Sequence, residues 1–170
     1  KPDGSLYRAG ERFRQPDLAA TLERIAANGP REFYEGETAR LIAAEMQNHD
    51  GLMTAQDLAD YQPTIREPVH GQYRGYDVYA MSPPSSGGAH IVQMLNMLEG
   101  YDIHAMGFNS ARTIHVMSEA MKRAYADRAE YLGDTDFVDV PLAGITSKAY
   151  AEELRAQIDL DRATPSSEIA

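Results

Sequence analysis

The fold class is decided by residues 69–98, VHGQYRGYDVYAMSPPSSGGAHIVQMLNML. Apolar and polar side chains alternate on both sides of Arg74-Gly75, which is typical of a β-hairpin. After Pro83-Pro84 the apolar residues follow a helical period up to Gly100. Because a two-stranded ribbon is only marginally stable in water, we expect the hairpin to pack against helices or to join a larger sheet.

Helical periodicity extends to both sides of this stretch, with residues that start or stop helices at its ends. The predicted helices run from Asp17 to Gly29-Pro30, up to Asp50-Gly51, from Thr54 with Asp57 to Pro63, from Ser110 to Gly133, and from Thr146 or Ser147 past Ile158. Residues 164–167 read as an exposed tail. The predicted fold class is α+β, mainly α, with about five to six helices and one hairpin.

Two of these helices are expected to form the main core. The first should turn Ile91, Leu95 and Leu98 inward, and the second Ile114, Met117, Met121, Ala124 and Tyr125. The last helix carries Tyr150, Leu154 and Ile158 on one face. A chain of 170 residues with 43% hydrophobic residues is long enough for one such core, so we expect a single domain.

Composition excludes several classes of function. A formal net charge of -10 argues against a nucleic-acid surface, which needs clustered Lys and Arg. No apolar stretch approaches the roughly 20 residues that cross a bilayer. The absence of cysteine excludes disulfides, thiolate metal sites and a cysteine nucleophile. The opening residues, Lys1 to Gly4, contain no initiator Met or signal pattern, so we expect that the chain begins within a longer protein.

Ser85, Ser86, Gly87 and Gly88 form the candidate site, at a strand-to-helix junction. Such a junction can offer backbone N–H groups to an anion or place a serine on a sharp turn. The G-x-S-x-G elbow of serine hydrolases is not matched, because Pro84 occupies the place of its first glycine. We favour a structural role in which one serine caps the helix and the glycines permit close packing.

Three histidine and acidic patterns are weaker candidates. His90 lies four residues after Ser86, but we expect a satisfied or partly exposed histidine rather than a base. His115 and Glu119 should form a helix-surface pair, since the further ligands of a zinc site are missing. Calcium is disfavoured for the acidic stretch from Asp127 to Asp139, which fails the EF-hand spacing and which Lys122, Arg123 and Arg128 should partly neutralise. We therefore predict no metal and no cofactor.

Five motifs, in order along the chain, resemble γ-glutamyltranspeptidase. They are Glu32-Phe33-Tyr34-Glu35-Gly36; Gly51-Leu52-Met53-Thr54 with Asp57-Leu58 and Tyr61; Tyr73-Arg74-Gly75-Tyr76; Pro83-Pro84-Ser85-Ser86-Gly87-Gly88; and Ala124-Tyr125-Ala126-Asp127-Arg128 continuing to Tyr131-Leu132-Gly133-Asp134. The likeness extends from about Gly4 to Ile169. Residues 1–170 therefore resemble one segment, the C-terminal part of that family's large subunit.

This resemblance implies an N-terminal-nucleophile hydrolase. A precursor cleaves itself into two subunits, and the new N-terminal threonine of the small subunit takes the γ-glutamyl group from glutathione or related amides and passes it to water or an amine. No position of this chain matches the family's catalytic residues, so we expect the segment alone to be inactive. Its hairpin would belong to a four-layer αββα sandwich, and the open edges of the isolated segment would favour a homodimer.

The resemblance also implies the partners: the rest of the large subunit, the small subunit, and glutathione or γ-glutamyl amides in the complete enzyme, with periplasmic or secreted placement. Cephalosporin acylases and enzymes that process poly-γ-glutamate share the scaffold, so a related acylase is one alternative. A non-catalytic helical interaction module is another. A serine hydrolase that uses Ser86 is the least favoured.

Overall fold

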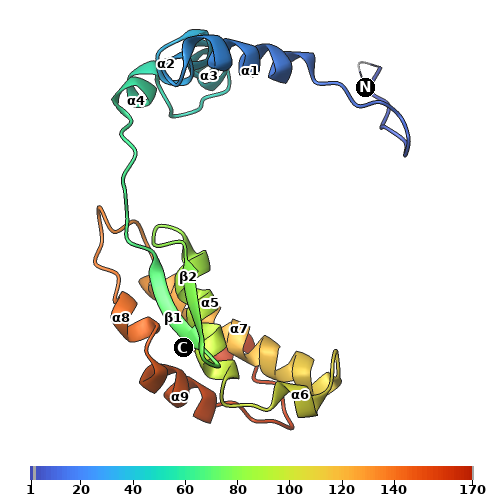
Figure 1. Cartoon of the computed structure of the whole chain (residues 1–170), viewed down its shortest axis with the longest axis vertical. Helices are drawn as coiled ribbons and strands as arrows, with labels where there is room; N and C mark the ends of the chain where they lie inside the picture. The colour runs from blue at the N-terminus through green and yellow to red at the C-terminus, as the bar shows by residue number, and fades with distance from the viewer. Residues whose placement is uncertain (2, 170) are drawn as a thin grey trace. The chain divides into compact units, whose positions relative to one another are not determined.

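The computed structural model describes Lys1 and residues 3–169 (Figure 1). It is mainly helical with one two-stranded antiparallel sheet, as predicted. The single core is not observed: the chain divides into two compact units, of which the first spans Lys1–Thr64 and the second begins at Ile65. The division falls where residues 61–68 form neither helix nor strand, because Pro63 and Pro68 cannot donate backbone hydrogen bonds.

Four helices form the first unit: α1 (Pro16–Asn28), α2 (Arg31–Tyr34), α3 (Glu37–Asn48) and α4 (Ala55–Asp60). The short α2 contacts each of the other three. The predicted capping box at α4 is confirmed, since Thr54 and Asp57 exchange side-chain to backbone hydrogen bonds.

The second unit begins with the predicted hairpin, β1 (Val69–Tyr73) and β2 (Tyr76–Ala80), in which Val69 pairs with Ala80. Its helices are α5 (Ser86–Leu98), α6 (Ile103–Met106), α7 (Ala111–Tyr131), α8 (Leu142–Ile145) and α9 (Lys148–Ala156), followed by a 3-10 turn (Ser166–Glu168). The six helices of six or more residues are those predicted, and the four-residue helices α2, α6 and α8 were missed. None of the helices in the described part of the chain is both long and apolar enough to cross a membrane.

Helix α5 is the centre of the second unit, because it packs against both strands and against α7, α8 and α9. The core cluster joins Met97 of α5 to Ala120 and Ala124 of α7 and to Ala151 and Leu154 of α9. The alanines let the helices approach closely, so the core combines alanine faces of α7 and α9 with the larger Met97 and Leu154.

The predicted inward face of α7 was largely wrong, whereas that of α5 was wrong only at Ile91, because Leu95 is half-buried and Leu98 packs against the core cluster. Of the α7 set only Ala124 is buried, whereas Ile114, Met117, Met121 and Tyr125 are 44% to 58% exposed. Ile91 of α5 is also exposed, and the buried residues of α5 include Ala89, Val92 and Met97. Helix α7 therefore packs through its smaller face, and its larger apolar side chains form an unpartnered stripe. We call these four exposed residues of α7 the apolar stripe.

Candidate functional site

The run from Ser85 to Gly88 forms the junction between β2 and α5, where it makes contacts that join the two elements to their neighbours. Ser85 is the N-cap, and its Oγ accepts a hydrogen bond from the Gly87 backbone N–H at 3.3 Å. Ser86 Oγ accepts one from Arg128 Nε at 3.1 Å, which ties α5 to α7. A Cβ on Gly88 would collide with the Met81 carbonyl oxygen, whereas a Cβ on Gly87 would make only an ordinary contact with Ser85 Oγ. The favoured reading of one cap and a close glycine contact agrees with these contacts.

A buried polar network lies behind this junction. His90 Nδ1 is 2.9 Å from Gln93 Oε1, and the Gln93 amide donates to Asp127 of α7. Tyr150 of α9 donates from its hydroxyl to the other oxygen of Asp127 at 2.9 Å. Burial raises the pKa of Tyr150 to about 12, and the bond to the Asp127 carboxylate adds to this effect. The phenol therefore stays protonated and joins α9 to α7.

His90 does not pair with Ser86. We expected a satisfied or partly exposed histidine. His90 is buried and its Nδ1 has a partner, but its Nε2 has no hydrogen-bond partner among the described residues. Sequence reasoning missed Gln93, Asp127 and Tyr150 as a group. The available signal was that Asp127 continues the Ala120 and Ala124 face of α7, where a carboxylate needs a buried partner.

A second buried charge lies farther toward the start of α7. Glu119 is fully buried and accepts from Lys122 Nζ at 2.6 Å, Arg123 Nη1 at 2.7 Å and the Thr164 backbone N–H at 3.1 Å. Burial by itself would raise the pKa of Glu119, but these hydrogen bonds outweigh it and lower the pKa to about 2. Glu119 is thus no surface partner of His115, which instead contacts the Asp159 carbonyl oxygen at 2.7 Å.

The acidic stretch is neutralised from a different part of the chain than predicted. Arg66 pairs with Asp136 at 2.6 Å and with Asp134 at 3.4 Å, because the segment before β1 lies beside the segment after α7. The predicted cations are engaged elsewhere: Lys122 and Arg123 bind Glu119, and Arg128 binds Ser86. No group of three His, Asp or Glu side chains among the described residues is placed to hold a metal ion.

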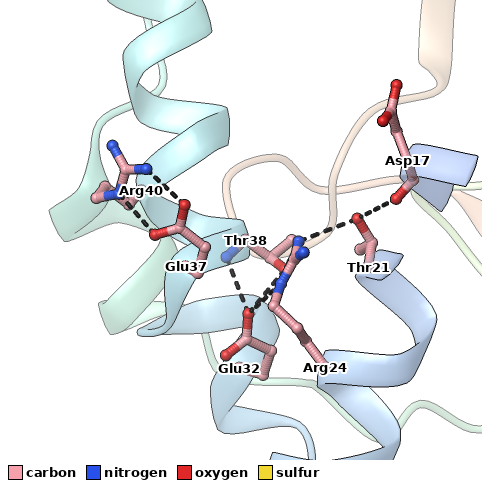
Figure 2. A network of polar contacts seen from close by, with 7 residues as sticks. All are labelled: Asp17, Thr21, Arg24, Glu32, Glu37, Thr38 and Arg40. Carbon is pink, nitrogen blue, oxygen red and sulfur yellow. Dashed lines mark hydrogen bonds and ion pairs between the residues drawn. The ribbon is translucent and has the colours of Figure 1, made fainter. Parts of the chain in front are cut away.

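The first unit contains its own polar network, around Glu32 (Figure 2). This buried carboxylate accepts from Arg24 Nε of α1 and from the Thr38 backbone N–H at the start of α3, both at 3.1 Å. Burial opposes ionisation, but the bonds from Thr38 and Arg24 outweigh it and lower the pKa of Glu32. A Cβ on Gly36 would collide with Glu32 itself, so the Glu32-to-Gly36 motif encodes this junction of helices.

These networks position elements rather than reacting groups. Ser86 bonds to Arg128 and His90 bonds to Gln93, so the described contacts do not assemble the pair of nucleophile and base that acyl transfer needs. What they define is a class of structure: a helical layer on a hairpin, held by buried ion pairs and carrying exposed apolar faces.

Comparison with known proteins identifies the family of this layer. The sequence matches the gamma-glutamyltranspeptidase family over residues 1–170. It is 54% identical to the glutathione hydrolase proenzyme of Escherichia coli K12 over 98% of this chain, and 47% identical to the acylase ACY 1 proenzyme of Pseudomonas sp. SE83 over 95% of this chain. A crystal structure of Helicobacter pylori gamma-glutamyltranspeptidase superposes on 96% of the chain with a TM-score of 0.85 and 47% identity.

The chain belongs to the γ-glutamyltranspeptidase family, as its motifs predicted. It spans 29% of the length of the two curated relatives and 47% of the Helicobacter pylori chain.

Proposed function

We propose that this chain is the later part of the large subunit of a γ-glutamyltransferase or glutathione hydrolase, and that it is inactive alone. Its partners are the rest of that subunit and a small subunit carrying the threonine nucleophile. The complete enzyme transfers the γ-glutamyl group of glutathione or related amides to water or to an amine. In this proposal Ser85 to Gly88 shape the shell of the active site and do not react. Family resemblance further suggests periplasmic or secreted placement.

The apolar stripe of α7 carries the proposal. Its four large side chains recur three or four residues apart, so they lie on one face of the helix, and α7 already buries a separate face against α5. A helix that packs on one face and carries a second, exposed apolar face is typical of a position between two layers. The part of the relatives that this chain does not span can supply the second layer.

The test is a chimera of the E. coli glutathione hydrolase proenzyme in which this chain replaces the matching stretch of 167 aligned residues. We expect the chimera to cleave itself into two subunits and to release 4-nitroaniline from γ-glutamyl-4-nitroanilide. The 170-residue chain alone, assayed beside it, should release none.

Two results would count against the proposal. A chimera that folds but neither cleaves itself nor hydrolyses the anilide would show that this chain cannot serve as a large-subunit segment. Hydrolysis by the isolated chain would mean that it contains a nucleophile, and Ser85→Ala and Ser86→Ala variants would then identify it.

A related acylase is the second candidate, favoured by the 47% identity to the Pseudomonas acylase proenzyme. The complete enzyme, with its own small subunit and the rest of its large subunit, separates the two if it is assayed with γ-glutamyl-4-nitroanilide and with a glutaryl anilide, which lacks the α-amino group. Preference for the γ-glutamyl compound supports the first candidate, and preference for the glutaryl compound supports the acylase.

A further inference from the structure

The C-terminal part of the second unit is held to α7 in an unusual way. Residues 157–164, which we call the strap, follow α9 and form no helix or strand. Ile158 is its one buried side chain, and those of residues 159–163 are exposed. Apolar side chains of the strap therefore contribute little to holding it on α7.

Side chains of α7 instead bind the main chain of the strap at both ends, and we call these hydrogen bonds the grip. Arg123 Nη2 donates to the Gln157 carbonyl at 2.9 Å, and His115 Nε2 contacts the Asp159 carbonyl at 2.7 Å. Beyond these, Lys122 Nζ donates to the Thr164 carbonyl at 2.7 Å, and Glu119 accepts from the Thr164 N–H at 3.1 Å. Four α7 side chains thus satisfy main-chain groups that secondary structure leaves free.

Glu119 organises this grip. Its carboxylate binds both Lys122 and Arg123, and each of these cations also holds a strap carbonyl. Replacing a buried ion pair by apolar residues often leaves the free energy of unfolding unchanged or raises it. The presence of such a pair is therefore weak evidence that it serves stability, and a role in selecting one conformation explains it better. The arrangement specified here is the path of the strap.

That path leads to a particular surface. Beyond the strap, Ser166 and Ile169 line an open cavity of about 520 Å³ together with Met121, Lys122, Tyr125 and Ala126. Met121 and Tyr125 belong to the apolar stripe. The hydrogen bonds to Thr164 therefore place Ser166 and Ile169 beside the apolar stripe.

We infer that Glu119 is a positioning residue that fixes the strap on α7 and so sets the direction in which the chain leaves the second unit. The inference about the strap concerns this chain alone. Its consequence rests on the proposed function: in the complete enzyme, Glu119 would set the path by which the large subunit approaches its cleavage point.

Trypsin tests the first part on the 170-residue chain, because Arg162 lies in the strap and is followed by Ala163. Cleavage after Arg162 requires local opening of the strap, so its rate follows the open population when opening is fast. We expect Glu119→Gln to raise this rate about tenfold or more, because the hydrogen bonds to Gln157 and to Thr164 at the two ends of the strap are both weakened. Cleavage after Arg12 and Arg14, in the first unit, provides the internal standard and should not change.

Glu119→Gln leaves the buried Arg123 without its carboxylate, so a milder variant is needed as well. Lys122→Met removes the donor to Thr164 and the bond from Lys122 to Glu119 but keeps the pair of Glu119 with Arg123, and it should raise cleavage after Arg162 with unchanged helical circular dichroism. Glu130→Gln, an exposed acid on the same helix, is the matched control. Equal Arg162 cleavage in the wild type, Lys122→Met and Glu119→Gln would overturn the inference.

The second part is tested in the E. coli chimera. Lys122→Met should slow self-cleavage about tenfold or more, while the kcat and KM of the mature fraction stay within about twofold of the parent chimera. If self-cleavage is unchanged while cleavage after Arg162 is faster, Glu119 and Lys122 hold the strap on α7 but do not set the path to the cleavage point. Failure of the unsubstituted chimera to cleave itself would instead count against the proposed function.

Discussion

At the scale of single residues, Gly88 allows α5 to pack close to the end of β2, because glycine has no Cβ to collide with the backbone there. In Gly88→Ala the new Cβ would overlap the Met81 carbonyl oxygen, so the backbone must shift. We expect the free energy of unfolding to fall by about 1–3 kcal/mol, the usual penalty of overpacking. Urea denaturation followed by circular dichroism measures the change.

Gly87→Ala is the matched comparison, because a Cβ there meets only Ser85 Oγ at an ordinary 3.5 Å. Within a helix alanine is favoured over glycine by about 0.5–1 kcal/mol, so this variant should be neutral or slightly more stable. If both variants lost the same stability, the close contact between Gly88 and Met81 would not be what limits the packing.

Glu119 makes the stability of the second unit depend on acid. Its pKa is about 2 in the folded chain and 4.5 without its partners, so its contribution is complete above pH 4.5 and is lost as the pH falls through 2. The full shift corresponds to about 3 kcal/mol. We expect Glu119→Gln to be less stable than the wild type at pH 7, with a difference that shrinks steadily between pH 4.5 and pH 2.

Urea denaturation of both proteins at pH 7, 4 and 2.5 measures this trend. Glu130→Gln again serves as the control, and its difference from the wild type should stay near zero throughout. A difference between wild type and Glu119→Gln that is constant with pH would mean that Glu119 is not ionised through contacts made only in the folded state.

At the scale of elements, the apolar stripe of α7 should make the isolated chain associate. We expect Met117→Lys with Met121→Lys to shift the chain toward monomer in sedimentation velocity, because two ammonium groups then interrupt the exposed apolar face. Ala129→Lys with Glu130→Gln changes the net charge equally from outside the stripe and should leave association unchanged. Equal loss of association in both would point to general charge repulsion.

Sequence patterns predicted where elements begin and end more successfully than which face they bury. The capping residues Thr54, Ser110 and Ser147 act within a few residues of the chain, so local chemistry decides them. The choice of face on α7 depends on what packs there. The large side chains of the apolar stripe favoured that face in the prediction, but in the described part of the chain the core cluster forms on the alanine face.

At the scale of the whole molecule, the polar networks were beyond single-sequence reasoning because their members lie far apart in the chain. Gln93 and Asp127 are separated by 34 residues, and Glu119 and Thr164 by 45. The candidate run from Ser85 to Gly88 was found because its residues are adjacent in the sequence, whereas the hydrogen bond from Arg128 to Ser86 spans 42 residues. Nothing local predicts that Arg66 reaches Asp136, 70 residues later.

The chimera shows whether the apolar stripe is buried in a complete enzyme. Met117→Lys with Met121→Lys in this background would bury two charges in an interface that offers them no partner, which is strongly destabilising. We expect self-cleavage and hydrolysis of the γ-glutamyl anilide to fall by about a hundredfold or more, since a loss near 3 kcal/mol in assembly has that effect. Ala129→Lys with Glu130→Gln should keep at least about half of the activity. Full activity of the double lysine variant would instead place the stripe in solvent, and the second layer inferred from this exposed apolar face would have to be abandoned.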